Sequence, residues 1–164
     1  MIIHKQSSRQ LMKHLLMILL ALTLSVAAVA QNAAALYKEG KALYDAKNYQ
    51  KAFPKLKAAA DKGHKKAQYR VGRCYDKGYA VTKNDAVAVS WYRKSASQGY
   101  AKAQYQLAKC YLNGEGVAKD EAKAKVWLNK AIRDEKHGKE IKDKINQNAA
   151  EGKDEAKRLK RLIK

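Results

Sequence analysis

Apolar residues in the middle of the chain recur with the spacing of two short amphipathic helices. In residues 64–77 they fall at i, i+4, i+7 and i+8, the stripe of a half-buried helix: Ala67, Val71, Cys74 and Tyr75. Gly78 then predicts the end of this helix. A second stripe follows at Ala88, Trp91, Tyr92 and Ser95. Asn84 is a good N-cap for it, and Gly72 inside the first helix predicts close approach of a neighbouring helix.

The same unit returns 36 residues later, where Trp91 is matched by Trp127 and Gly78 by Gly114. Asp120 is the expected N-cap of the second helix of this later unit. Its apolar stripes consist of Ala103, Leu107, Cys110 and Tyr111, and then of Ala124, Trp127, Leu128 and Ala131. A fixed period of this length is the signature of stacked helical units.

A shorter unit precedes these two, with a first helix marked by Leu36, Gly40, Leu43 and Tyr44. Its second helix is predicted to start near Asn48 and to bend, rather than break, at Pro54. After the third unit, Ile141 and Ile145 predict a short capping helix. We therefore predict an all-α, right-handed α-α solenoid. Its three helix-turn-helix repeats cover about 33–63, 64–99 and 100–135, and a capping helix and basic amphipathic tail cover 136–164.

The first 30 residues have the order of a secretory signal peptide. Basic residues up to Lys13 precede an apolar run over 15–29, and Ala28-Val29-Ala30 is a small-x-small cleavage site. We predict cleavage before Gln31, export to the periplasm or the extracellular space, and no transmembrane segment afterwards. A retained membrane anchor is the alternative, but the run is shorter than the roughly 20 residues that a spanning helix needs.

The charge of the chain is strongly positive. Its 35 Lys and Arg against 15 Asp and Glu give a net charge of +20, and removal of residues 1–30 would leave +17. Such a charge favours acidic proteins, anionic membrane surfaces or nucleic acid. Predicted export argues against nucleic acid as the normal ligand.

The two cysteines and the two tryptophans are predicted to be structural. Cys74 and Cys110 occupy the same position in successive units. Equivalent points on packed helices lie about 8–10 Å apart, beyond the reach of about 7 Å of a disulfide. Free, buried thiols are therefore expected. Trp91 and Trp127, at matching repeat positions, are predicted to be core residues rather than a sugar-binding platform.

The sequence lacks the usual signatures of catalysis and of metal binding. After the predicted signal peptide only His64 and His137 remain, far apart, and there is no Cys-x-x-Cys pair and no phosphate-binding glycine loop. The Gly114-Glu115-Gly116 stretch is explained by a repeat turn. We predict no catalytic residue, no metal and no cofactor, and therefore not an enzyme.

The third unit carries a specific resemblance. Ala-Gln-Tyr-x-Leu-Ala-x-Cys-Tyr-Leu-Asn-Gly-Glu-Gly-Val over 103–117 and Ala-x-x-Trp-Leu-x-Lys-Ala over 124–131 resemble the Sel-one-like repeat family of the tetratricopeptide-like superfamily. The resemblance covers roughly residues 33–133 and implies an adaptor that binds proteins or peptides. Several exported relatives carry paired cysteines within one unit. This chain lacks that pairing, so their disulfide framework does not carry over.

The resemblance also implies that the first helix of each unit lines a concave groove. Each of these helices carries a tyrosine followed four residues later by a cation: Tyr37 with Lys41, Tyr69 with Arg73, and Tyr105 with Lys109. A ladder of phenol rings and cations suits an acidic or C-terminal peptide, or an anionic glycan. The alternative is that the tyrosines are repeat consensus that packs between units and that the cations are only solvated.

Two functions follow as hypotheses. The first is an exported scaffold or adaptor that holds a protein or peptide, expected to be acidic, in its concave groove. The second is a basic envelope-associated protein that binds anionic glycan or lipid mainly by charge. Its candidate residues lie in the C-terminal tail, although a basic terminal helix is most often only a solvated cap: Lys157, Arg158, Lys160 and Arg161.

Overall fold

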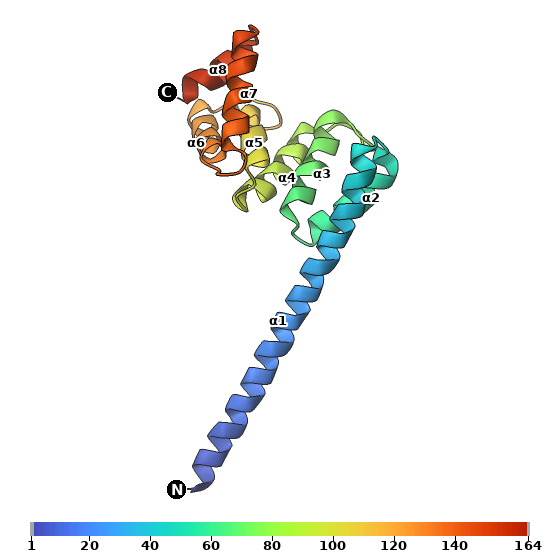
Figure 1. The fold of residues 1–164 in the computed structure, drawn as a ribbon, viewed down its shortest axis with the longest axis vertical. Helices are drawn as coiled ribbons and strands as arrows, with labels where there is room; N and C mark the ends of the chain where they lie inside the picture. The colour runs from blue at the N-terminus through green and yellow to red at the C-terminus, as the bar shows by residue number, and fades with distance from the viewer. Residues whose placement is uncertain (1, 164) are drawn as a thin grey trace.

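The chain folds as a stack of antiparallel helices with a long N-terminal helix projecting from one end (Figure 1). The computed structural model describes residues 2–163, with side chains described for 10–21 and 23–163. Eight helices and no strand occur in this part of the chain. They are α1 (Ile2–Asp45), α2 (Tyr49–Asp61), α3 (Lys65–Lys77), α4 (Asp85–Ser97), α5 (Ala101–Asn113), α6 (Glu121–Ile132), α7 (Gly138–Ala150) and α8 (Asp154–Leu162). The prediction of an all-α solenoid is confirmed.

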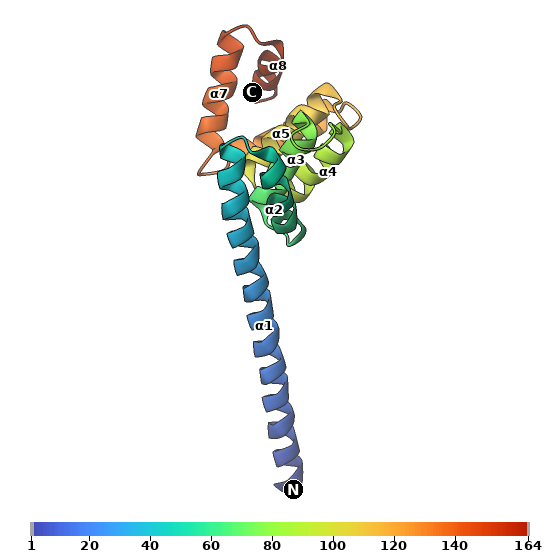
Figure 2. The same ribbon diagram turned by 90° about the vertical axis from the view of Figure 1, so that its right-hand side faces the viewer.

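The helices pack in sequential pairs, as a solenoid requires. α1 packs on α2, α3 on α4 and α5 on α6, while α2 against α3 and α4 against α5 join one pair to the next. α7 and α8 form a last hairpin that packs mainly on itself and also contacts α5 and α6. Figures 1 and 2 show this hairpin at the far end of the molecule from the N-terminal part of α1.

One helix joins the predicted signal peptide to the first repeat. α1 runs without interruption from Ile2 to Asp45, through the predicted cleavage site. Only its last third belongs to the solenoid. Ala33 is the first buried residue, whereas Leu11 and every other large apolar side chain described before it stays well exposed. α1 is also the one described helix long and apolar enough to cross a membrane.

Local signals in the sequence set the ends of the repeat helices. Gly78 and Gly114 end α3 and α5 in the left-handed region, with φ of 70° and 77°. The side chain of Asn84 accepts a hydrogen bond from the Val87 amide, and that of Asp120 accepts one from the Lys123 amide. These caps were predicted from the sequence and are confirmed.

Close helix approach at Gly72 is confirmed as well. A methyl group at this position would lie 2.7 Å from the ring of Tyr92, so only glycine lets α4 pack this tightly on α3. Gly40 has the same role in the first unit, where an added methyl group would lie 2.9 Å from Leu56. α2 begins after Asn48, as predicted, and continues through Pro54.

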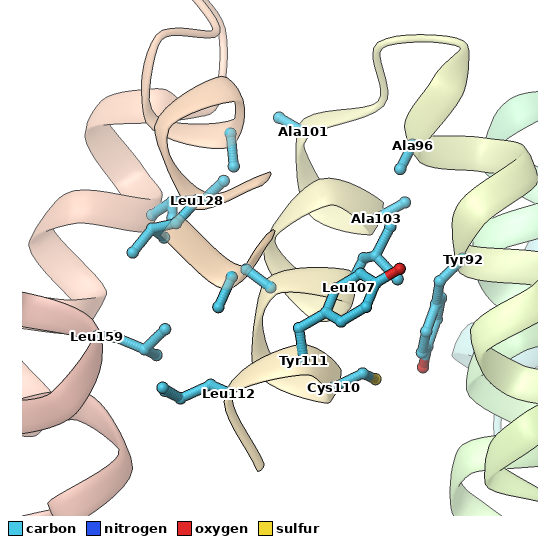
Figure 3. Packing of buried hydrophobic residues seen from close by; sticks show 14 of the residues in the cluster. Tyr92, Ala96, Ala101, Ala103, Leu107, Cys110, Tyr111, Leu112, Leu128 and Leu159 are labelled. Carbon is cyan, nitrogen blue, oxygen red and sulfur yellow. The ribbon is translucent and has the colours of Figure 1, made fainter. Parts of the chain in front are cut away.

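The C-terminal hairpin shares the main hydrophobic core. Leu159 of α8 is fully buried in the same cluster as Leu112 of α5 and Leu128 of α6 (Figure 3). Ile141 and Ile145 of α7 are also buried there. The hairpin therefore covers the last repeat, as a solenoid cap must.

The prediction that both tryptophans are core residues is confirmed for Trp91 and only in part for Trp127, which packs against the core without being fully buried. Trp91 is only 8% exposed, but Trp127 is half-buried. The ammonium of Lys57 lies 5.3 Å from the Trp91 ring, in addition to Lys94 at 4.3 Å. Arg93, which precedes Trp127 as Lys57 precedes Trp91, donates instead to the Tyr111 hydroxyl, 3.3 Å away. The Trp127 ring therefore has one cation–π contact, with the ammonium of Lys130 at 4.5 Å from the ring centre.

The N-cap of α3 predicts a pH-dependent stability. His64 Nδ1 accepts a hydrogen bond from the Ala67 amide at 3.2 Å, which requires that nitrogen to be unprotonated. Burial and then the charge of Lys66 lower the pKa of His64. The folded state thus disfavours protonation, and the stabilising effect of the cap is present above the unfolded pKa and lost as the pH falls through the folded one.

We expect the free energy of unfolding to decrease between about pH 7 and about pH 5, and His64→Asn to reduce this decrease because asparagine caps without titrating. Denaturant titrations across the pH series measure it. His137→Asn is the matched control and should keep the decrease. An unchanged slope in His64→Asn would contradict the prediction.

Candidate functional site

A small pocket lies where the second repeat, the third repeat and α7 meet. It has a volume of about 150 Å³. Three of the predicted groove residues line it, namely Tyr69, Arg73 and Tyr105. The other lining residues come from α5 and α7 and were not predicted: Lys102, Gln106, Glu140, Ile141 and Lys144. The pocket therefore combines two phenol rings with three cations and one carboxylate.

The other three predicted residues do not line this pocket. Tyr37 stacks on His64 with ring centroids 4.3 Å apart. Lys41 forms an ion pair with Asp45 at 2.5 Å, on the exposed surface of α1. Lys109 lies at the opposite end, where it pairs with Glu155 of α8 at 2.9 Å.

Each cation of the predicted ladder has a carboxylate of its own chain nearby. Asp45 forms an ion pair with Lys41, and Glu155 forms one with Lys109. Asp76 lies 3.9 Å from Arg73. The Arg73 contact is the longest of the three. Arg73 is therefore the ladder cation least committed to a partner within the chain.

Arg73 also has an unused donor. Its Nη1 donates to the Tyr69 hydroxyl at 3.3 Å, but its Nε is buried and makes no hydrogen bond. The neighbouring Asp76 accepts a hydrogen bond from the Tyr92 hydroxyl at 3.0 Å, which occupies part of that carboxylate. A buried guanidinium nitrogen without a hydrogen-bond acceptor is costly, and the Asp76 carboxylate oxygen lies 3.9 Å from this Nε, too far for a hydrogen bond.

Burial and near charges set the pKa values of Tyr105, which lines the pocket, and of Lys109, which lies outside it. Burial raises the pKa of the Tyr105 hydroxyl, which stays protonated and can donate. Burial alone would lower the pKa of Lys109, but the hydrogen bond and charge of Glu155 outweigh it and raise that pKa. Both groups therefore keep the protonation states of neutral pH.

Sequence reasoning missed Arg70, which joins the first two repeats. Its guanidinium lies 3.0 Å from Asp45 and 4.7 Å from the centre of the Tyr44 ring. It also missed a row of aromatic contacts along the starts of the first helices. Tyr69 meets Tyr100 at 5.3 Å, as Tyr37 meets His64. The 36-residue offset from His64 to Tyr100 was the signal that could have revealed this row.

The basic tail is folded into the hairpin. Lys157, Arg158, Lys160 and Arg161 line a cleft of about 620 Å³ with Ala149, Ala150 and Asp154. The apolar face of α8 already packs within the fold, because Ala156 and Leu159 are buried. Arg158 donates to the carbonyl oxygen of Leu112 at the end of α5. The tail therefore cannot insert an apolar face into a membrane, and only its charges remain available.

Both cysteines are free and buried, as predicted. Burial raises the pKa of Cys74 to about 11 and that of Cys110 to about 12. Because the thiolate is the reactive form, both thiols should react slowly.

We expect a thiol reagent to label Cys74 and Cys110 slowly in native protein purified without reductant, and completely in denaturant. Mass spectrometry of the labelled peptides gives both rates. A Cys74–Cys110 crosslinked peptide would refute the prediction.

Within the part of the chain that the structure describes, no group of three or more His, Cys, Asp and Glu side chains could hold a metal ion. The pocket itself presents two phenol rings, three cations and one carboxylate. A stack of antiparallel helix pairs joined one to the next defines an α-solenoid of the tetratricopeptide-like class.

Comparison with known proteins gives the family within this class. The Sel1 repeat profile matches residues 65–100 and 101–134. The chain thus carries two Sel1 (Sel-one-like) repeats, as the sequence resemblance indicated. Sel1 repeat solenoids typically serve as scaffolds for protein–protein interaction and are generally not enzymes. A search of curated proteins found no match.

Solved structures show the same fold. A Sel1 repeat protein from Oxalobacter formigenes is 36% identical, with a TM-score of 0.61 over 71% of this chain and 46% of its own. A protective antigen of uropathogenic Escherichia coli with an SLR fold is 30% identical, with a TM-score of 0.62 over 80% of this chain and 30% of its own. Cysteine-rich protein B of Helicobacter pylori is 27% identical, with a TM-score of 0.50 over 51% and 63%. The chain thus spans less than two thirds of each.

Proposed function

We propose that this protein is an exported scaffold that binds a protein or peptide on the concave face of its solenoid. The observation that carries the proposal is the pocket between α3, α5 and α7. There Tyr69 and Tyr105 offer rigid, amphipathic rings, the side chains most often found at the centres of binding surfaces. Arg73 adds a buried donor that has no acceptor.

The pocket favours an acidic partner. Arg73, Lys102 and Lys144 face a single lining carboxylate, Glu140, which lies 3.7 Å from Lys102. A partner carboxylate that reaches Arg73 would gain a charge-assisted hydrogen bond, roughly twice as strong as a neutral one. Lys41 and Lys109 contribute less to this preference than the sequence suggested, because each already has a carboxylate partner.

The test is capture of partners from an envelope fraction by the chain starting at Gln31. A triple variant, Tyr69→Ala, Arg73→Ala and Tyr105→Ala, should lose the captured protein. Lys157→Ala, Lys160→Ala and Arg161→Ala together form the control on the hairpin and should retain it. Equal capture by the triple variant and the unchanged chain would rule out the pocket as the binding site.

The alternative is a charge-driven binder of anionic glycan or lipid, and the cationic cleft between α7 and α8 favours it. The two functions differ in their salt dependence. Binding by surface charge weakens steeply as salt screens it, whereas binding in a shaped pocket keeps a salt-independent part. Capture repeated at low and high salt therefore separates them.

Export and cleavage before Gln31 are part of the proposal. The packed part of α1 begins at Ala33, two residues beyond this site, and Val29 just before it is 48% exposed. Cleavage would therefore remove little that holds the solenoid together. N-terminal sequencing of the exported protein should find Gln31 first. An intact Met1 species in the membrane fraction would instead support the anchor.

A further inference from the structure

The connectors of this solenoid alternate between two opposite edges. Because consecutive helices are antiparallel, α1, α3 and α5 all begin at one edge, and the N-terminal part of α1 projects from it (Figure 1). We call this the arm edge; it holds the α2–α3, α4–α5 and α6–α7 connectors. The distal edge holds the α1–α2, α3–α4, α5–α6 and α7–α8 connectors.

The two edges differ in the sign of their charge. Counting each connector with two residues on either side, the arm edge has seven Lys and Arg against three carboxylates, and the distal edge has five against nine. The arm-edge cations are Lys62, Lys65, Lys66, Lys102, Arg133, Lys136 and Lys139. The arm-edge carboxylates are Asp61, Asp134 and Glu135, with Glu140 one residue beyond the counted range.

The distal-edge charges have a local explanation. Asp85 and Glu121 lie in the first turns of α4 and α6, where a carboxylate favours the positive end of the helix dipole. Asn84 and Asp120 cap the same helices. These residues stabilise the fold wherever the protein resides.

The arm-edge cations run against that rule. Lys65, Lys66 and Lys102 lie in the first turns of α3 and α5, neither of which has an acidic residue there. A cation at a helix N-terminus is unfavourable to the helix. Lys65 makes only a contact of 3.4 Å with the Gln98 carbonyl, and Lys66 is exposed. Lys102 lies 3.7 Å from Glu140, but folding does not account for Lys65 and Lys66, and a residue pattern that breaks a local rule points to function.

The apolar part of α1 leaves the solenoid at this same edge. Lys62 and Ala30 line one shallow depression together with Val26 and Val29, so the α2–α3 connector lies beside the end of the apolar run. Within Gln10–Asp45, α1 reaches a mean hydropathy of 2.0, and it is long enough to cross a bilayer. With α1 in a membrane, Lys62 would lie at the level of the headgroups, where a lysine can place its ammonium group in a polar environment.

We propose that the arm edge is a docking surface for the anionic lipid headgroups of the membrane that holds the apolar segment of α1. The solenoid then stands on its cationic edge, with the acidic distal edge turned away and the concave pocket open to the side. This inference rests on the proposed export, because it places the solenoid outside the membrane that the N-terminal segment enters. It concerns the uncleaved chain, before the proposed cleavage at Gln31 or with the segment retained as an anchor. It replaces the C-terminal tail as the lipid-binding element.

The test uses the full chain, synthesised in a cell-free system and inserted into nanodiscs of pure phosphatidylcholine or of phosphatidylcholine with phosphatidylglycerol. Amide hydrogen exchange is followed at residues 62–66 and 98–102. Each lysine near an anionic surface changes affinity about fivefold. Exchange of these amides should therefore slow by about fivefold or more with phosphatidylglycerol, and the slowing should vanish at high salt.

Matched charge reversals identify the edge. Lys62→Glu, Lys65→Glu and Lys66→Glu together should abolish the slowing, and they should fold well because glutamate suits the start of α3. Lys77→Glu, Lys83→Glu and Lys119→Glu make the same change of net charge on the distal edge and should leave it intact. Equal exchange in both lipids, loss in both triple variants, or slowing at 157–161 instead would each overturn the proposal. Capture by the soluble chain involves no lipid, so the proposed groove function can fail or hold separately.

Discussion

Replacement of Trp91 by alanine is expected to lower the free energy of unfolding by about 3–5 kcal/mol, the range for removal of a buried aromatic ring. The Trp91 ring is 8% exposed and packs in the cluster that joins the first repeat to the second. Its loss would leave a cavity between α2 and α4 and would free Lys57 and Lys94 from their ring contacts.

Chemical denaturation followed by circular dichroism measures this change. Trp127→Ala is the natural control, because it removes the same side chain from the same repeat position. Trp127 is half-buried, so a smaller cost of about 1–2 kcal/mol is expected. Equal costs for the two variants would show that the difference in burial between the two rings has no energetic consequence.

Replacement of Arg73 by alanine is expected to weaken binding of the groove partner by about 1.5–3 kcal/mol, the scale of a hydrogen bond to a charged group. The reason is the position of its guanidinium, which lines the pocket and has a buried Nε without an acceptor. Isothermal titration with the captured partner, once identified, measures the loss.

Arg73→Ala should also cost some stability. Replacement of an ordinary surface residue changes the free energy of unfolding by less than about 0.5 kcal/mol. The structure leaves the Arg73 side chain 29% exposed and hydrogen-bonded to Tyr69, so a loss nearer about 1 kcal/mol is expected. Thermal unfolding of the same variant separates this loss from the effect on binding.

Lys41→Ala is the matched control for binding, since it removes a ladder cation that Asp45 already neutralises. It should change binding little. If the hairpin variant of Lys157, Lys160 and Arg161 abolishes binding while Arg73→Ala does nothing, the groove hypothesis fails and the charge-driven binder replaces it.

The sequence by itself determined the repeat architecture, because its signals act over a few residues. The positions of Gly78, Gly114, Asn84 and Asp120 specify helix ends through backbone conformation and capping, and both depend only on near neighbours. The match of Trp91 to Trp127 revealed the period. Gly72 predicted the close approach of a neighbouring helix, and the ring of Tyr92 on α4 makes this contact.

Tertiary structure alone decided what each repeated position does. Trp91 and Trp127 are equivalent in sequence, yet Lys57 lies over one ring while Arg93 donates to Tyr111 and the other ring stays partly exposed. Lys41, Arg73 and Lys109 form one ladder in sequence, yet only Arg73 lines the pocket. Repeated side chains diverge because their environments come from neighbouring helices that do not repeat.

The C-terminal hairpin has the largest such effect. Its sequence predicted a cap and a basic tail, and the helices did form, since Ile145 and Leu159 lie on the apolar faces of α7 and α8.

 The packing of α8 then placed Glu155 on Lys109 and buried Leu159 beneath α5 and α6. α7 supplied Glu140 and Lys144 to the pocket. No pattern along the chain carries this information, because contacts between residues far apart in sequence depend on how the whole stack twists. The repeat period, the caps and the free thiols could thus be read from the sequence, whereas the walls of the pocket and the charge of the two edges arise only when the helices are stacked.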